Sequence, residues 1–551
     1  MSLSTKRFLG LLLGLIVINL LSAFVYARFD LTSDKRYTLT DGTRQLLATL
    51  PARVHVDVYL TGNLPPGFRR LETAVRETLE GFKAEGESNI SYRFIDPITG
   101  TTTEQNKRLA ELAALGLQPT NLFANQGGKR TEQLVVPGAV VHYEGKQIGV
   151  LLLKGNKAAS PEEQLNQSYE GVEYQLAAAI RRLTQPEGSR RRVGLVFGHT
   201  QVPPERFSDV LASIQETYDL FFVDLRKPGP VEGVDALLVL KPDQPFVESE
   251  IFKLDQYVVK GGRALFVVDG QRIDSVGTEG SYAQPLVLGL DELFFNWGAR
   301  VNKDVVKDLN CGVIPLNVGN MGDKPNIQLV PWRFYPVLNS FGDSPITRNL
   351  DAIYGRFVST IDTVRANGIH KTVLLKTSAY TQVLKTPTLV SYNEARQQPD
   401  PATYLGGVRS VGTLLEGSFA SLFANQLLPD SLKNGYRETG VAAKVLLCSD
   451  GDLVVNDVDY KRKAPLPLGY DRFTRTQFAN KDFILNAIDY LVDPEGLIVA
   501  RQREVPLRPL DSVKIGAERT QWQALNVLGP LALVLALGLI WQAIRRRQYA
   551  R

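Results

Sequence analysis

Two long apolar segments, one near each end of the chain, set the strongest limit on how it can fold. Residues 8–27 and residues 524–544 carry no charged side chain, and each has about the 20 residues that a helix needs to cross roughly 30 Å of hydrocarbon. No run of comparable length and polarity lies between them. We therefore expect two transmembrane helices that flank a large water-exposed portion of the 551-residue chain.

Positive charges flank both segments on their outer sides. Because Lys and Arg are retained on the cytoplasmic side of a membrane, both termini are expected in the cytoplasm and the bulk of the chain in the periplasm of a bacterium. The residues expected to anchor the chain at the inner membrane and its lipid are Lys6, Arg7, Trp541, Arg545, Arg546 and Arg547. Small residues at positions 25 and 27 leave open the alternative of a cleaved signal peptide.

The composition of the chain excludes two classes of protein. Its 63 basic and 58 acidic residues are interleaved, which leaves a net charge of +5 and no basic face of the kind that follows a phosphate backbone. Nucleic acid is therefore not an expected partner. Cys311 and Cys448 are too few for a disulfide scaffold, and they are expected to be core residues or, alternatively, one bridge.

The first part after the N-terminal anchor alternates between strand and helix patterns. The predicted elements are a strand at 54–60, a helix at 68–83, a strand at 90–95, a helix near 104–115, a hairpin at 139–153 and a helix at 171–183. This order favours a small α/β domain of thioredoxin-like layout. It contains no Cys-x-x-Cys pair, so thioredoxin-type redox chemistry is excluded.

The second part opens with a continuous apolar strand at 193–197, typical of a parallel sheet that is buried on both faces. The elements that follow are a helix at 206–216, strands at 220–223 and 236–240, a helix at 248–259, strands at 264–268, 373–376 and 445–448, and a helix at 481–492. This alternation predicts a doubly wound α/β domain.

These patterns divide the chain into five parts. The predicted boundaries are an anchor at 1–29, a small α/β ectodomain at 30–185, a large doubly wound ectodomain at 190–500, a linker at 501–523, and an anchor with a basic tail at 524–551. Residues near 270–371 are rich in Gly, Pro and Asn. Such composition favours loops, so this stretch is expected to be a large irregular insertion.

Several motifs occur in an order that is similar to a known family. They are DLTSDKRYTLTDGTRQLL, GVEYQLAAAIRRL, VGLVFGHT, LLEGSFASLF and VLLCSDGDLVVND. Over nearly its whole length the chain resembles the GldG family, the auxiliary component of ABC-type transport systems known from gliding motility. One departure is that His199 is followed by Thr200 and Gln201, where the family pattern has Gly and Glu.

The resemblance implies a non-catalytic accessory subunit whose large domain has a glutamine-amidotransferase-like fold. Its implied partners are a separate ABC permease and a separate cytoplasmic ABC ATPase. The ectodomain is then expected to bind cargo or a partner in the cell envelope, either a protein or a glycan. An envelope glycan-binding module or a hydrolase with a degenerate amidotransferase-like fold is the competing hypothesis.

No motif for energy conversion or catalysis stands out. The nearest match to a phosphate-binding loop, at residues 127–131, lacks the required spacing and the preceding apolar strand. The four histidines form no HExxH or HxH pair, and Cys448 is not followed by a tight elbow. The aspartates at 450–459 lack the terminal Glu of a calcium loop, which favours a capped turn. We therefore expect no catalytic residue, no cofactor and no metal.

Polar residues that follow predicted strands are the remaining candidates for a ligand site, because open α/β sheets bind ligands at the carboxyl ends of their strands. The candidates are His199, Thr377, Ser378, Glu416, Ser418, Ser421 and Asp450. If they share one rim, they suit a polar ligand. The alternative is that they cap helices, as Ser, Thr and Asp commonly do at such junctions.

Overall fold

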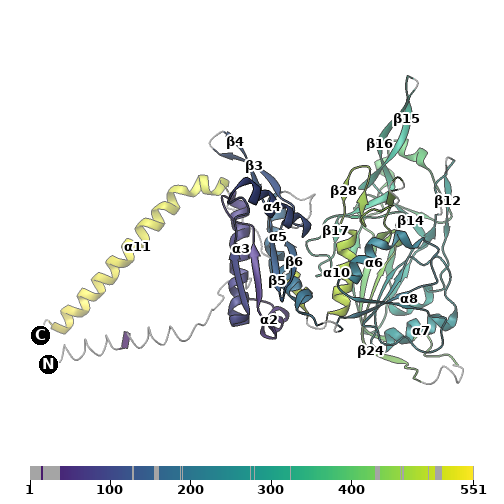
Figure 1. The fold of residues 1–551 in the computed structure, drawn as a ribbon, viewed down its shortest axis with the longest axis horizontal. Coiled ribbons are helices and arrows are strands. Elements are labelled where there is room, and N and C mark those ends of the chain that lie inside the picture. The colour runs from purple at the N-terminus through teal and green to yellow at the C-terminus, as the bar shows by residue number, and fades with distance from the viewer. Residues whose placement is uncertain are drawn as a thin grey trace. The chain divides into compact units, whose positions relative to one another are not determined.

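The computed structural model has a mixed α/β fold (Figure 1). It describes residues 14–15, 38–126, 129–153, 161–186, 188, 190–273, 275–277, 279–322, 324–427, 435–459, 461, 464–493, 496–502 and 512–549. The chain divides into two compact units, Met1–Glu504 and Val505–Arg551. Apart from residues 14 and 15, the first predicted anchor lies outside the described residues.

A four-stranded sheet organises the first part of the larger unit. Its order is β2-β1-β5-β6, with β1 parallel to β2 and antiparallel to β5. The strands are β1 (Val54–Val58), β2 (Ile90–Phe94), β5 (Gly138–Tyr143) and β6 (Lys146–Leu151). The predicted hairpin turn is confirmed, because Glu144 and Gly145 both have positive φ, as the tight turn between β5 and β6 requires.

Helices cover the two faces of this sheet unequally. The helices of this part are α2 (Asp41–Ala48), α3 (Pro66–Gly86), α4 (Thr102–Ala114) and α5 (Pro161–Thr184). The apolar sides of α2, α3 and α5 share one core with Val54, Val56 and Val58 of β1. On the other face, Leu112 of α4 packs with Val140. A second hairpin, β3 (Thr120–Gln126) and β4 (Lys129–Val135), was not predicted.

An eight-stranded sheet forms the centre of the second part, in the order β17-β20-β23-β24-β10-β9-β7-β8. Its strands are β7 (Arg192–Val196), β8 (Asp219–Val223), β9 (Ala236–Leu240), β10 (Arg263–Val267), β17 (Ser340–Phe341), β20 (Ile369–Lys376), β23 (Ser410–Ala420) and β24 (Thr439–Cys448). The run from β8 to β24 is parallel and has the 2-1-3-4-5 order of a doubly wound sheet. The remaining three strands are antiparallel.

Both faces of this sheet are buried, as the continuous apolar strands predict. Along β9, Leu238 and Leu240 share a core with α6 (Ser208–Gln215) and α10 (Asn480–Val492). The alternate residues Leu237 and Val239 share a different core with α7 (Glu248–Val259) and α8 (Asp291–Trp297). The side-chain alternation of a strand therefore explains why two helical layers are needed.

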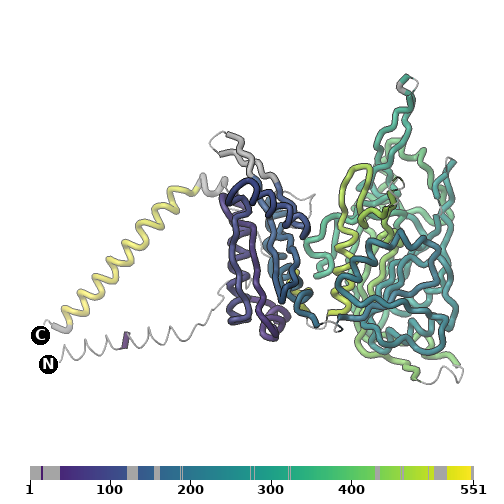
Figure 2. The backbone as a smooth tube through the Cα atoms, in the orientation of Figure 1, coloured from purple at the N-terminus to yellow at the C-terminus, as the bar shows by residue number. Residues whose placement is uncertain are grey.

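The expectation of an irregular insertion at 270–371 is wrong, because this stretch is rich in strands. They are β11 (Gln271–Arg272), β12 (Ser281–Pro285), β13 (Ala299–Val301), β14 (Asp304–Asp308), β15 (Cys311–Met321), β16 (Lys324–Leu338), β18 (Ile353–Tyr354) and β19 (Ile361–Thr363). The long β15–β16 hairpin extends away from its base (Figure 2). At that base Trp332, Phe334 and Phe357 pack together, and this aromatic core supports strands despite the turn-forming composition.

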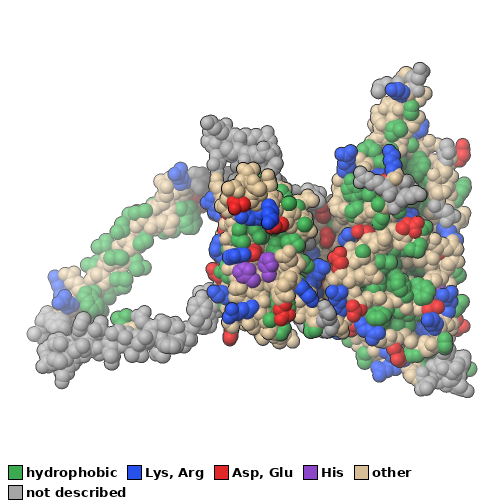
Figure 3. Space-filling view, in the orientation of Figure 1, with side chains coloured by type: hydrophobic (Ala, Val, Ile, Leu, Met, Phe, Trp, Pro, Cys, Tyr) green, Lys and Arg blue, Asp and Glu red, His purple; other side chains and the backbone are tan. Residues whose placement is uncertain are grey.

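The second compact unit contains the helix α11 (Ser512–Tyr549). Within the described residues, one helix is long and apolar enough to cross a membrane, and it is the stretch Glu518–Arg547 of α11. It contains the predicted segment 524–544 with Trp541, Arg545, Arg546 and Arg547, and its apolar side chains are exposed (Figure 3). The helix continues through Pro530.

The core of the large sheet provides a direct test of the fold. Phe266 on β10 is fully buried and contacts Phe294 and Trp297, whereas Phe295 on α8 is 55% exposed. We expect F266A to lower the free energy of unfolding by about 3–5 kcal/mol, since it removes a packed ring and leaves a cavity. F295A, the matched control, should change it by less than about 0.5 kcal/mol. Denaturant unfolding followed by tryptophan fluorescence measures both, and equal effects would contradict the assigned core.

Candidate functional site

The carboxyl ends of the parallel strands meet at one edge of the eight-stranded sheet. His199 follows β7, Lys241 follows β9, Asp269 follows β10 and Asp450 follows β24. Open α/β sheets bind their ligands at this edge, so a ligand site is expected here. Lys241 and Asp269 were not among the predicted candidates, although each closely follows a buried apolar strand.

Four ionisable residues form a compact group at this edge, which we call the carboxylate cluster: Lys241, Asp269, Asp450 and Asp452. Lys241 Nζ lies 3.0 Å from Asp269 Oδ2 and 3.0 Å from Asp452 Oδ2. The three aspartates present carboxylate oxygens within 4.8 Å of one another. The backbone N–H of Gly451 donates to Asp269, and that of Asp452 donates to Asp450, at 2.7 and 2.8 Å.

The aspartates of the carboxylate cluster differ in protonation because their partners differ. Burial, together with the charges of Asp452 and Asp269, holds the pKa of Asp450 well above its usual value. Burial also acts to raise the pKa of Asp452, but the charges of Lys241 and Arg356 outweigh it and lower that pKa. Burial acts to lower the pKa of Lys241, yet Asp269 and Asp452 raise it and keep the ammonium charged.

This arrangement is complete without an added ion. Three carboxylates at short range suit a hard cation such as Ca²⁺, but the ammonium of Lys241 already stands between two of them. Asp450 accepts backbone N–H groups from Asp452 and Arg356, the latter at 2.9 Å, so it caps the short helix Gly451–Val454 as the capped-turn interpretation expects. The cluster therefore ties strand ends together.

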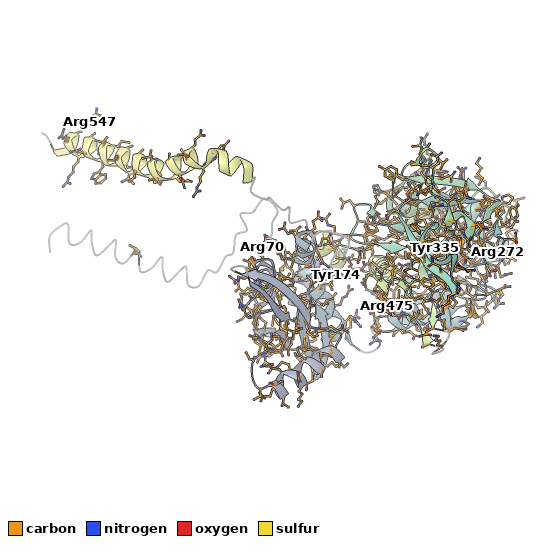
Figure 4. The ribbon with its side chains drawn as sticks, turned by 90° about the horizontal axis from the view of Figure 1, so that it is seen from above. Arg70, Tyr174, Arg272, Tyr335, Arg475 and Arg547 are labelled. Carbon is orange, nitrogen blue, oxygen red and sulfur yellow. The ribbon has the colours of Figure 1, made fainter. Side chains whose placement is uncertain are left out.

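A second ion group lies beside the carboxylate cluster. Arg356 donates to both oxygens of Asp457, at 3.1 and 2.9 Å, and Arg206 lies 3.6 Å from the same carboxylate. The guanidinium of Arg356 is also 5.5 Å from the ring centres of Tyr335, which is labelled in Figure 4, and Tyr354. Burial acts to raise the pKa of Asp457, but Arg356 lowers it, so this carboxylate stays ionised.

His199 is 6% exposed at the same edge and is held from two sides. Its Nε2 lies 3.0 Å from Glu250 Oε2, and its ring stacks on Phe246 with centroids 3.9 Å apart and planes within 5°. The backbone N–H groups of Asp243 and Gln244 donate to its carbonyl oxygen. These contacts bring no hydroxyl or thiol to the imidazole, so they supply no activated nucleophile of the kind that a hydrolase needs.

Thr377 and Ser378 follow β20 and also lie at this edge, where they close turns. Arg409 N–H donates to Thr377 Oγ1 at 2.8 Å. Ser378 donates from its hydroxyl and its backbone N–H to Asp308, at 2.5 and 2.8 Å. Both hydroxyl groups are therefore engaged in contacts within the chain.

The structure does not bring Glu416, Ser418 and Ser421 to this edge. Strand β23 is antiparallel to β24, with Glu416 opposite Lys444 and Ser418 opposite Ala442, so these residues lie toward the other edge. Glu416 accepts a hydrogen bond from the hydroxyl of Tyr490 at 2.7 Å. Ser421 donates to the carboxylate of Asp255 at 2.6 Å. The candidates therefore do not share one rim. The expectation failed because the apolar pattern of a strand does not indicate the direction in which the strand runs in the sheet.

The two cysteines are free, so they form no bridge with each other. Cys448 is buried at the end of β24, and burial raises the pKa of its thiol well above the usual value. Burial likewise raises the pKa of Cys311 to about 11. Because the thiolate is the nucleophile, neither environment supports cysteine catalysis.

A polar junction joins the two parts of the larger unit. Asp489 on α10 accepts hydrogen bonds from the hydroxyls of Tyr174, on α5 (labelled in Figure 4), and Tyr218, and it pairs with Arg181 at 3.5 Å. The short helix η6 (Leu497–Gln502) follows α10 and returns to the first part. Its Leu497 is fully buried in the core of the four-stranded sheet. A cavity of 370 Å³ opens at this junction.

Comparison of the chain with models of known protein families identifies two matches. The model of a family described as an ABC-type uncharacterized transport system matches residues 190–487, and that of a domain of unknown function matches residues 33–142. No curated protein matches the chain. The mmIFT52 N-terminal domain is 12% identical with a TM-score of 0.30, over 55% of this chain and 97% of its own. A thua-like protein from Parabacteroides merdae is 10% identical with a TM-score of 0.25, over 55% and 90%.

Replacing Lys241 tests whether the carboxylate cluster holds the sheet edge. K241M removes the ammonium that pairs with the buried carboxylates of Asp269 and Asp452, so we expect it to lower the free energy of unfolding by about 3–5 kcal/mol near neutral pH. Burial already raises the pKa of Asp269 despite the opposing charge of Lys241, and loss of the ammonium should raise it further above the unfolded value. The folded state then binds more protons, and the deficit shrinks as pH falls toward about 5.

The matched control is K260M, since Lys260 is exposed at the end of α7. It should change the free energy of unfolding by less than about 0.5 kcal/mol at either pH. Denaturant titrations at the two pH values measure both variants. Wild-type stability of K241M at neutral pH would show that the cluster carries no structural role.

Proposed function

The chain belongs to the family of auxiliary components of ABC-type transport systems, and from this membership we propose that it is a non-catalytic, membrane-anchored subunit that couples an extracytoplasmic domain to a separate permease and ATPase. The observation that carries the proposal is the match over residues 190–487, followed in the same chain by the apolar helix Glu518–Arg547. The internally paired groups at the sheet edge support a role without chemistry.

The proposed topology places both termini in the cytoplasm of a bacterium and the bulk of the chain in the periplasm. It is supported by Arg545, Arg546 and Arg547, which follow the apolar part of α11 and would be retained on the cytoplasmic side. The segment 8–27, preceded by Lys6 and Arg7, would form the second anchor. The helices would then contact the permease and the surrounding lipid.

The junction between the two parts suggests how such a subunit would work. ATP hydrolysis in the cytoplasm would shift the permease helices and, with them, α11. Because η6 precedes α11 in the chain and inserts Leu497 into the core of the four-stranded sheet, a pull on α11 would act on the contacts of Asp489 with α5. The domain arrangement, and with it the binding of cargo, an envelope protein or a glycan, would change accordingly. A role in gliding motility belongs to the same proposal.

Affinity purification tests the assignment of partners. The tagged full chain, solubilised in mild detergent, should co-isolate an ABC ATPase and a permease. A variant that ends at residue 502 should lose both, because it lacks α11 but keeps η6. Recovery of the full chain without either partner, under conditions in which it stays folded, would contradict the proposal.

Protease accessibility tests the topology separately. In spheroplasts, external protease should digest the bulk of the chain, since the proposal places residues 30–523 outside the cytoplasm. A tag at either terminus should be cleaved only after the membrane is permeabilised. Digestion of the terminal tags in intact spheroplasts would show that the orientation is wrong.

A further inference from the structure

Arg501, on η6, is a buried cation that has only neutral partners. It is 8% exposed, and its guanidinium donates to Asn486 Oδ1 and, at 2.6 Å, to the carbonyl oxygen of Arg348. The guanidinium carbon lies 5.2 Å from the ring centre of Tyr174, which is labelled in Figure 4. Among the residues that the structure describes, no carboxylate forms an ion pair with it. Buried charges are normally paired, so a counter-charge from outside the chain is expected here.

Arg501 lines the cavity of 370 Å³ at the junction, to which both α5 and α10 contribute residues. This volume lies within the range of small-molecule sites, about 300–1,000 Å³. On α5, Gln164, Gly171 and Gln175 line it, and their spacing of seven and four residues puts them on one face of the helix. Gly171 faces open space, since no atom lies within 4 Å of the position that a methyl group would take. Within the described ranges, the side-chain amides of Gln164 and Gln175 make no hydrogen bond, so both can bind a ligand.

Two carboxylates line the same cavity, those of Asp351 and Asp482. In the described part of the chain neither forms an ion pair, although Asp351 Oδ1 accepts the backbone N–H of Ala352 at 2.8 Å. The backbone N–H of Ala479 donates to the carbonyl oxygen of Ala352 at 2.9 Å, which holds Asp351 near the first turn of α10. Asp482 belongs to that turn. The cavity therefore has acidic groups near the start of α10.

Arg501 and these carboxylates are separated by about one turn of α10. Arg501 donates to Asn486, which follows Asp482 by four residues, and four residues of an α-helix span about 6 Å. Asn486 also donates to the carbonyl oxygen of Ile346 at 3.1 Å, so the segment 346–352 follows α10 from Asn486 back to its start. The cation therefore lies toward one end of the cavity and the carboxylates toward the other.

We propose that this cavity binds a short peptide of about two residues with free termini. The terminal carboxylate of the peptide pairs with Arg501, and its terminal ammonium pairs with Asp351 and Asp482. An extended chain spans about 3.3–3.6 Å per residue, so the charged ends of a dipeptide match a separation of about 6 Å along α10. The side-chain amides of Gln164 and Gln175 each offer a carbonyl and N–H donors, which complement the groups of a peptide bond.

The charges of the lining favour a zwitterion over other small ligands. The described residues of the lining include three cations and three carboxylates: Arg181, Arg182, Arg501, Asp351, Asp482 and Asp489. Arg181 pairs with Asp489, and Arg182 pairs with Glu216. A neutral sugar would leave Arg501 without a counter-charge, whereas a ligand with only negative charge would be repelled by Asp351 and Asp482.

As a statement about cargo, this inference rests on the proposed role in ABC transport. Peptide binding is measured on the isolated chain, whereas the permease and the ATPase are detected by co-isolation. Absence of peptide binding with both partners recovered would therefore overturn this inference alone. Peptide binding without the partners would overturn the transport role and leave a peptide-binding protein.

Calorimetric titration of the purified full chain in detergent with alanylalanine tests the proposal. Wild type should bind one dipeptide per chain. The dipeptide amide, which lacks the carboxylate, and the N-acetyl dipeptide, which lacks the ammonium, should each bind at least about tenfold more weakly, because each loses a charge-assisted hydrogen bond. Cellobiose, a neutral disaccharide, should not bind, and its binding in place of the dipeptide would overturn the proposal.

Two variants connect the binding to the cavity. R501Q should weaken the binding of alanylalanine at least about tenfold and remove the preference over the dipeptide amide. Q175L should weaken it about three- to tenfold without a loss of thermal stability, since Gln175 makes no side-chain hydrogen bond within the described chain. The matched control is Q284L, which replaces an exposed glutamine on β12 and should bind as wild type does.

Melting of each variant without peptide shows whether it is folded, and Q175L keeps the test decisive if R501Q does not fold. The proposal is overturned if wild type does not bind alanylalanine, or if the amide and the N-acetyl form bind as tightly as the free dipeptide. It is equally overturned if folded Q175L and Q284L bind the dipeptide with the same affinity.

Discussion

The ammonium of Lys241, placed between Asp269 and Asp452, is the interaction on which the edge of the eight-stranded sheet depends. It joins the ends of β9 and β10 to the turn after β24, which is distant from them in the chain although β24 neighbours β10 in the sheet. Buried charges are tolerated only when they are paired and hydrogen-bonded. The groups that would otherwise attract a ligand at this edge instead satisfy one another, and Arg356 with Asp457 extends the same pattern.

Much of the regular structure follows from local patterns in the sequence. The helix predicted at 248–259 is α7, Glu248–Val259, and the strand predicted at 236–240 is β9, Ala236–Leu240. Local patterns do not reveal the direction of a strand or which strand it pairs with. For this reason Glu416 was expected beside Asp450, although β23 runs the other way. The strands within 270–371 were missed because their Gly, Pro and Asn residues resemble loop composition, while their support comes from distant aromatic contacts.

The residues of the candidate site could also be predicted only in part from local sequence patterns. Lys241 and Asp269 each follow a buried strand, and this local signal could have identified them. The pairing of β1 with β5 has no local signal, because strand β2, the β3–β4 hairpin and the helices α3 and α4 lie between them in the chain. The junction between the two parts of the larger unit could not be predicted either, because Leu497 follows the eight-stranded part in the chain but is buried in the core of the four-stranded sheet. Its burial contributes about 1.5–3 kcal/mol by area alone, so the two parts share stability as well as a boundary.

The length of α11 has a mechanical consequence. Its 38 residues, at a rise of about 1.5 Å each, give a rod about 57 Å long, which is nearly twice the hydrocarbon thickness of a typical bilayer of about 30 Å. A rod of this length, set across a membrane, either leans steeply or stands well clear of the lipid surface. Under the proposed topology the second case would make it a lever arm, because a small change of tilt at its cytoplasmic end would sweep the opposite end through a much larger arc.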